Sequence, residues 1–147
     1  MCTFRLRSLW ALAIGAILAA TPVIARTNTV GDAFSGVWKL TVSPDQSAQQ
    51  AGKQVFTELV LFADGQLMAQ ACSSYGFKPG DYTLSQSGSS FTATMTTDTE
   101  SITWTATLGS SGMVGTVSWN KANGHVYQYT LQGVRQTMEE TGEASSN

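Results

Sequence analysis

Charged residues are scarce in this sequence, and the few that occur do not favour a nucleic-acid partner. Lys, Arg, Asp and Glu together make up 12% of the 147 residues, and the formal net charge is −2. A surface that binds nucleic acid needs a basic stripe, which eight Lys and Arg residues in a net acidic chain do not supply. We therefore expect no nucleic-acid partner.

Patterns of metal ligands and catalytic residues are missing as well. His125 is the single histidine and follows Gly124 in a predicted turn, and without a second histidine or a cysteine cluster it predicts no metal site. Asp98 and Glu100 are close in sequence, but catalytic carboxylate pairs usually come from separate strands inside a pocket, so we interpret both as residues of a solvated turn. No Gly-rich phosphate loop and no nucleophile elbow occurs. We expect neither enzyme activity nor a cofactor.

The longest apolar run lies near the start of the chain and is too short to span a bilayer. It extends from Leu9 to Ala20, follows two arginines and precedes a small-residue cleavage site at Val23 to Ala25. This order is typical of a secretory signal peptide, so we expect residues 1–25 to be removed and the mature chain to begin at Arg26. No later run reaches the roughly 20 apolar residues of a transmembrane helix. We predict an exported protein, secreted or periplasmic, without a transmembrane segment.

Cysteine is nearly absent, and the predicted processing leaves only one. Cys72 then has no partner for an internal disulfide, although an oxidising compartment would permit one. We interpret Cys72 as a small buried hydrophobic residue, with a reactive thiol or an intermolecular disulfide as the alternatives. The mature chain is long enough for one modest domain, which its core alone must stabilise.

Short alternating runs of β-branched and aromatic residues fill the rest of the chain. In the first run Trp38, Leu40 and Val42 share one face, which is the period of a strand with one buried side. Asp64-Gly65 between two apolar runs predicts a type I′ hairpin. Eight such runs, spaced by about 8 to 12 residues, predict an all-β domain with strands joined mostly by tight turns.

This pattern favours a single antiparallel eight-stranded up-and-down barrel, because closure removes the exposed strand edges. An open two-sheet sandwich is the alternative, since its inward alternation is the same. The segment Gln46 to Gln54 is either a helical turn or a long loop, and the third run extends from Gln66 to Ala71. The predicted organisation is a signal peptide over 1–25, a linker over 26–33, the barrel over 34–135 and a polar, disordered tail over 136–147.

Two features of this layout resemble a known family. Gly36-x-Trp38 on the first strand resembles the opening motif of the lipocalins and the wider calycins, and Arg135 just past the last strand is similar to the arginine that packs across the opening tryptophan in that family. The resemblance covers most of the mature chain in layout and these residues in detail. It implies a lipocalin-like barrel and a contact between Arg135 and Trp38.

Aromatic side chains are concentrated on the face that the alternation assigns to the barrel interior. They are Trp38, Tyr82, Phe91, Trp104, Trp119, Tyr127 and Tyr129. Ligand sites are mostly apolar with a few polar anchors such as tyrosine hydroxyls, so these residues are candidates for binding a small hydrophobic ligand. Equally, they can fill the interior, because an eight-stranded barrel is just wide enough to be packed solid or to hold one small ligand.

These observations lead to two functional hypotheses. The first is an exported binding protein of lipocalin-like type for a small hydrophobic molecule. The second is a solid barrel that acts through its surface loops as an inhibitor or protein-interaction module. Its contact element would be the loop from Cys72 to Gly80, because exposed aromatics such as Tyr75 and Phe77 on a scaffolded loop are favoured at interfaces.

Overall fold

The first strand buries the face that its alternation predicts. In the computed structural model, which describes residues 32–137, β1 (Gly36–Pro44) places Trp38, Leu40 and Val42 in the interior. β1 pairs with the second strand on one side and with the last strand on the other. This double pairing closes the sheet on itself, so the barrel is confirmed and the open sandwich is excluded.

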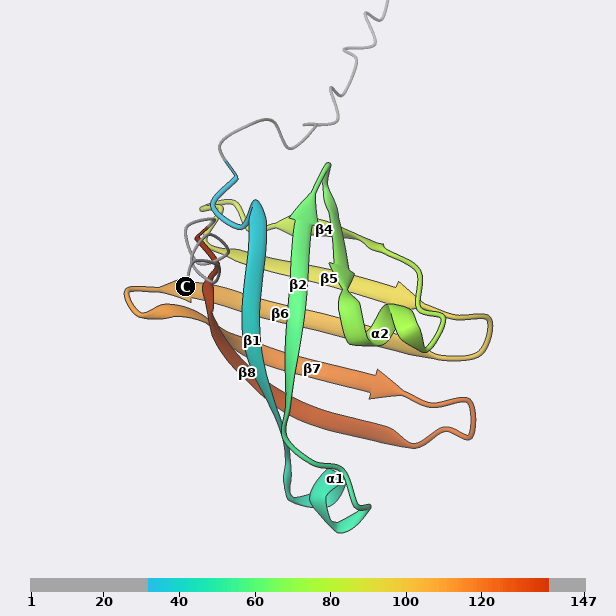
Figure 1. Cartoon of the computed structure of the whole chain (residues 1–147). Helices are drawn as coiled ribbons and strands as arrows, with labels where there is room; N and C mark the ends of the chain where they lie inside the picture. Colours follow the sequence, from blue (N-terminus) through green and yellow to red (C-terminus); the bar gives the residue numbers. More distant parts are fainter. Residues whose placement is uncertain (1–31, 138–147) are drawn as a thin grey trace, which may run out of the picture.

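Eight antiparallel strands follow one another around the barrel in sequence order (Figure 1). After β1 they are β2 (Phe56–Ala63), β3 (Gln66–Ala69), β4 (Gly80–Leu84), β5 (Ser90–Thr96), β6 (Ser101–Gly109), β7 (Gly112–Asn120) and β8 (Val126–Arg135). The β2–β3 turn has positive φ at both Asp64 (52°) and Gly65 (76°), so the predicted type I′ hairpin is confirmed. In Figure 1, β1 and β2 pass in front of β5 to β8, which run side by side behind them.

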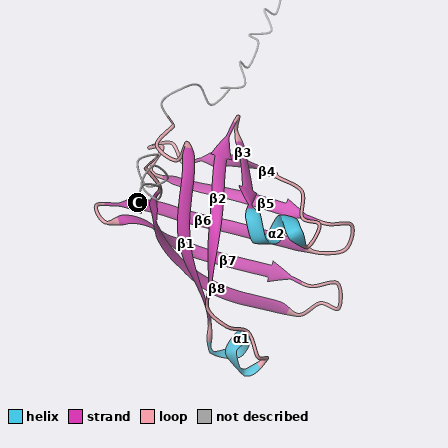
Figure 2. Cartoon of the chain, viewed as in Figure 1, coloured by secondary structure: helices cyan, strands magenta, loops and turns pink. Residues whose placement is uncertain are grey.

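Two short helices interrupt this meander (Figure 2). α1 (Gln46–Gln50) follows Pro44 and begins where Asp45 Oδ1 accepts the N–H of Ala48 at 2.8 Å, so the segment after β1 contains a helical turn. α2 (Gln70–Ser74) begins inside the predicted third strand, so the expectation that this strand reaches Ala71 is wrong. Ala69 has no polar side-chain atom that could cap α2, and the side chain of Glu58 accepts the N–H of Ala71 instead.

One end of the barrel is closed by packed aromatic side chains. Phe91 lies against Phe34 and Phe62, with ring centroids 4.9 Å apart in both pairs, and Phe62 lies 5.3 Å from Tyr82. These four rings are at most 5% exposed. The hydroxyl of Tyr82 donates to Asp32, which connects the start of the described chain to β4. This end therefore has no room for a ligand.

Several sequence predictions lie outside the described residues. They are the signal peptide over 1–25, the linker up to residue 31 and the tail from residue 138 onwards. Within residues 32–137, no helix is both long enough and apolar enough to cross a membrane.

Candidate ligand-binding cavity

The other end of the barrel is hollow. A cavity of about 560 Å³ lies between the start of β2, α2 and the adjoining ends of β6, β7 and β8. Six aromatic side chains contribute to its wall: Phe56, Tyr75, Phe77, Trp104, Trp119 and Tyr129. Protein cavities of about 300–1,000 Å³ typically hold small organic ligands. The barrel is thus packed at one end and open at the other.

The cavity opens to solvent between side chains that keep exposed surface. We call these the rim: Lys53, Phe56, Tyr75 and Trp119. Phe56 is 38% exposed and Tyr75 is 75% exposed, whereas the deeper wall residues Ile102 and Val117 are each 4% exposed. Apolar surface therefore continues from the rim to the floor, as a hydrophobic ligand requires.

Glu58 is the buried acid of the cavity wall. It occupies an inward position of β2 and is 1% exposed. Its Oε1 accepts the N–H of Ala71 at 2.8 Å, and the thiol of Cys72 donates to its Oε2 at 3.7 Å. Glu58 thereby supplies the cap that Ala69 cannot and holds α2 over the cavity. Burial raises the pKa of Glu58, because desolvation penalises the carboxylate more than these hydrogen bonds stabilise it.

Burial disfavours the reactive form of Cys72. It is 8% exposed, and burial, followed by the charge of Glu58, raises its pKa to about 12. The reactive form of cysteine is the thiolate, which is essentially unpopulated at neutral pH under these conditions. The interpretation of Cys72 as a small buried residue is confirmed.

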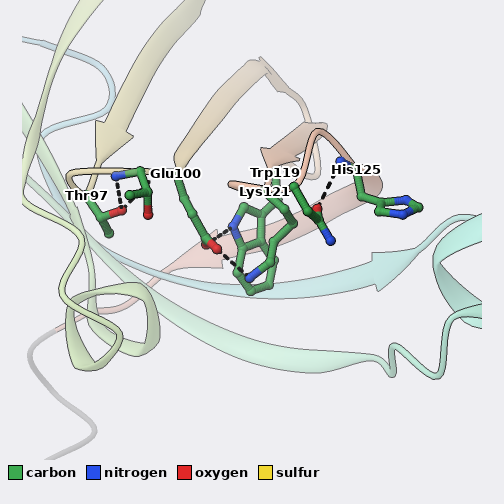
Figure 3. Close-up of polar contacts among 7 residues, drawn as sticks. Thr97, Glu100, Trp119, Lys121 and His125 are labelled. Carbon is green, nitrogen blue, oxygen red and sulfur yellow. Dashed lines mark hydrogen bonds and ion pairs between the residues drawn. The ribbon is translucent and has the colours of Figure 1, made fainter.

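Trp119 is held at the rim by an acid from the neighbouring turn (Figure 3). Glu100 Oε2 accepts the indole N–H of Trp119 at 2.9 Å, and Glu100 Oε1 lies 2.8 Å from Lys121 Nζ. That ammonium lies 4.2 Å from the centroid of the Trp119 ring. The hydrogen bond from Lys121 is the main cause of the lowered pKa of Glu100.

Glu100 lies in the β5–β6 turn, as expected, and it also contacts Trp119 and Lys121 of the β7–β8 region. Pairing of Ser101 with Asn120 brings the β5–β6 and β7–β8 turns together, so the acid of the first turn can contact the lysine that begins the second.

His125 lies in the β7–β8 turn, where its backbone N–H donates to Asn123 Oδ1. Its side chain is exposed, so its interpretation as a turn residue is confirmed. Among residues 32–137, no three His, Cys, Asp or Glu side chains gather into a metal site.

A second lysine, Lys53, lies over Trp119 and over the neighbouring ring of Tyr127. Lys53 Nζ is 5.4 Å from the ring centroid of Trp119 and 4.9 Å from that of Tyr127. The only ion pair between side chains of residues 32–137 joins Lys121 to Glu100, so Lys53 has no acidic partner there. The rim therefore carries an ammonium that no carboxylate of residues 32–137 neutralises.

The seven aromatic residues predicted to bind a ligand divide between the two ends of the barrel. Trp104, Trp119 and Tyr129 belong to the cavity wall, and Tyr127 lies beside Trp119 with ring centroids 6.4 Å apart. The other three, Trp38, Tyr82 and Phe91, are buried in the packed core away from the cavity. Trp104 also has a buried indole N–H without a hydrogen-bond partner among the described residues.

Sequence reasoning missed both charged residues of the cavity wall, Lys53 and Glu58. For Glu58 a signal was present. It alternates with outward-facing residues in the same way as Val60 and Phe62, which places it on the inward face of β2, where an acid is unusual. Lys53 lies in the loop before β2, where no periodicity indicates which way a side chain points. Phe77 was expected to be exposed, which is wrong: it is 4% exposed and faces the edge of Trp119 at 6.3 Å.

Comparisons of this chain with models of protein families, with curated proteins and with solved structures found no match. The closed barrel of eight antiparallel strands is consistent with a lipocalin-like fold.

Proposed function

We propose that this protein is an exported binding protein of lipocalin-like type that holds one small hydrophobic molecule in the open end of its barrel. The cavity of about 560 Å³ is the observation that supports this function most directly. Its wall is largely aromatic and aliphatic, which provides dispersion contacts and removes apolar ligand surface from water. Export is the part of the proposal that rests on the sequence of residues 1–25.

The packed end of the barrel also supports this proposal. Phe34, Phe62 and Phe91 fill the interior at the end of the barrel away from the cavity, so the free volume is confined to the other end. A preformed cavity on a closed sheet binds with little ordering of the protein. The barrel thus provides rigidity at one end and free volume at the other.

Fluorescence titration with the uncharged dye N-phenyl-1-naphthylamine tests the proposal. We expect saturable binding of one dye per chain, with quenching of tryptophan emission. Ala71→Phe adds a ring to the cavity wall and should weaken dye binding at least about tenfold, since the ring occupies ligand volume. Ala63→Phe places the same ring at an exposed position on β2 outside the cavity and should bind like the unmodified protein.

Circular dichroism and thermal unfolding would establish that both variants are folded. Absence of saturable binding to this dye and to a panel of other apolar probes would refute the proposed function. Undiminished binding by folded Ala71→Phe would show that the dye occupies some other surface.

Tyr75 favours the second hypothesis, a protein-interaction module. It is 75% exposed and lies just after α2, so its ring is available to a partner protein. Phe77 no longer supports this hypothesis, because it is buried. Retention of every captured partner by Tyr75→Ala in a pull-down would rule out this loop as the interface.

A further inference from the structure

We propose that the ligand of this cavity is an amphipathic carboxylate, with its apolar body inside the barrel and its carboxylate at the rim beside Lys53. This inference rests on the proposed function and adds the chemical class of the ligand. It follows from the distribution of charge around the cavity.

Among residues 32–137, Lys53 and Glu58 are the only charged residues in the cavity wall, and only one of them is available to a ligand. Glu58 is 1% exposed, and its two oxygens accept hydrogen bonds from the Ala71 N–H and the Cys72 thiol. A ligand ammonium would therefore find no accessible carboxylate in the wall and would be repelled by Lys53. The accessible charge of the cavity is positive.

The two lysines that lie over Trp119 differ in whether an acid pairs with them, and this decides which of them can bind an anion. Lys121 is 2.8 Å from Glu100, so its charge is already compensated. The ammonium of Lys53 lies over the rings of Trp119 and Tyr127 and pairs with no acid of residues 32–137, and the ring contacts stabilise an ammonium without neutralising it. An ammonium has three N–H donors, so Lys53 can keep its aromatic contacts and still donate to a ligand oxygen.

A carboxylate matches this site better than a more highly charged group. One lysine compensates one negative charge, and a hydrogen bond between two charged groups is stronger than a neutral one. Beyond the rim the wall consists of residues such as Phe77, Ile102 and Val117, which favour a chain or ring without polar groups. The carboxylate would remain at the partly exposed end, where its desolvation is least costly.

Displacement of N-phenyl-1-naphthylamine by a matched pair of competitors tests the inference. Dodecanoate and dodecan-1-ol have chains of equal length, and only the first carries a charge at neutral pH. We expect dodecanoate to bind at least about threefold more tightly than dodecan-1-ol at low salt, which corresponds to a weak, partly screened ion pair. The preference should decrease as the salt concentration rises.

Lys53→Met should abolish the preference for dodecanoate over dodecan-1-ol, because the side chain keeps its length and loses its charge. Lys39→Met makes the same change in net charge on the exposed, outward side of β1 and should keep the preference. Lys53→Arg should keep it too.

Equal affinity for the two competitors in the unmodified protein would overturn the inference while dye binding still supported the proposed function. Equal loss of the preference in Lys39→Met would also overturn it, since overall charge would then explain the effect. Failure of the dye and of the panel of other apolar probes to bind would remove both proposals.

Discussion

Arg135 lies over the indole ring of Trp38, with its guanidinium carbon 5.1 Å from the ring centroid. The two residues are directly opposite in the pairing of β8 with β1, the pair that closes the barrel. The guanidinium also donates to the backbone oxygen of Ala33, and the indole N–H of Trp38 donates to the oxygen of Phe34 at 2.7 Å. The contact expected from the lipocalin resemblance is confirmed, and it joins both ends of the domain.

Trp38→Ala should destabilise the barrel far more than Arg135→Ala. Trp38 is 4% exposed, so its removal leaves a cavity and should lower the free energy of unfolding by about 3 to 5 kcal/mol. A guanidinium on an indole face contributes about 0.5 to 2 kcal/mol, and Arg135 is exposed, which favours the lower part of that range. Chemical denaturation of both variants and the double variant yields the coupling energy. A coupling of zero would mean that the contact does not stabilise the barrel.

Glu58→Gln should change how stability depends on pH. Because burial raises the pKa of Glu58, the folded protein binds a proton more tightly than the unfolded chain. The stability that Glu58 contributes is therefore greatest below its ordinary pKa of 4.5, and it decreases as pH rises from there through the raised pKa of the folded protein. Gln keeps an oxygen for the Ala71 N–H and does not titrate, so the variant should gain stability relative to the unmodified protein over that interval.

Urea denaturation at a series of pH values checks this prediction. Glu58→Ala provides the contrast, since it does not titrate either but leaves the Ala71 N–H without an acceptor, and it should be less stable than Glu58→Gln by about 1 to 3 kcal/mol at every pH. A difference between Glu58→Gln and the unmodified protein that does not vary with pH would contradict the prediction.

Acid should release Trp119 from its position at the rim. The pKa of Glu100 is lowered, chiefly by the hydrogen bond from Lys121, so the ion pair is intact above the usual glutamic acid range and is lost as pH falls through the lowered pKa. Protonation removes the charge that Lys121 pairs with and weakens the acceptor for the Trp119 indole. We expect tryptophan emission to change at pH values below the range in which glutamic acid usually titrates, while the strand content measured by circular dichroism stays unchanged.

Glu100→Gln is the control for this experiment, because it keeps an acceptor for the indole and cannot titrate. The same change in emission in this variant would assign the transition to another group.

Gly65→Ala should weaken the β2–β3 hairpin. Gly65 has φ of 76°, a left-handed conformation that costs an L-residue about 1 to 2 kcal/mol. Asp64→Asn, at the neighbouring position with φ of 52°, should be close to neutral, because asparagine tolerates this conformation well. Thermal and urea unfolding of both variants tests the pair. Equal stability of Gly65→Ala and the unmodified protein would show that the turn adopts another geometry.

Local sequence signals determined the strands, the main turn and the inward faces of this protein. Alternation with period 2 depends only on the pleat of each strand, so Trp38, Leu40 and Val42 could be assigned to the interior before any partner strand was known. Asp64-Gly65 indicated its hairpin for a similarly local reason, since the turn type depends on the φ values of two residues.

Tertiary structure alone decided which inward residues fill the barrel and which surround the cavity. Alternation along the strands places Phe91 and Trp104 on the same face of the sheet. Closure of the barrel determines that Phe91 packs against other rings whereas Trp104 lines the cavity. Whether the β5–β6 and β7–β8 turns meet likewise depends on strand register. Helix α2 begins where Glu58, thirteen residues earlier in the chain, accepts the Ala71 N–H. Such contacts form only when distant segments meet, so no local pattern encodes them.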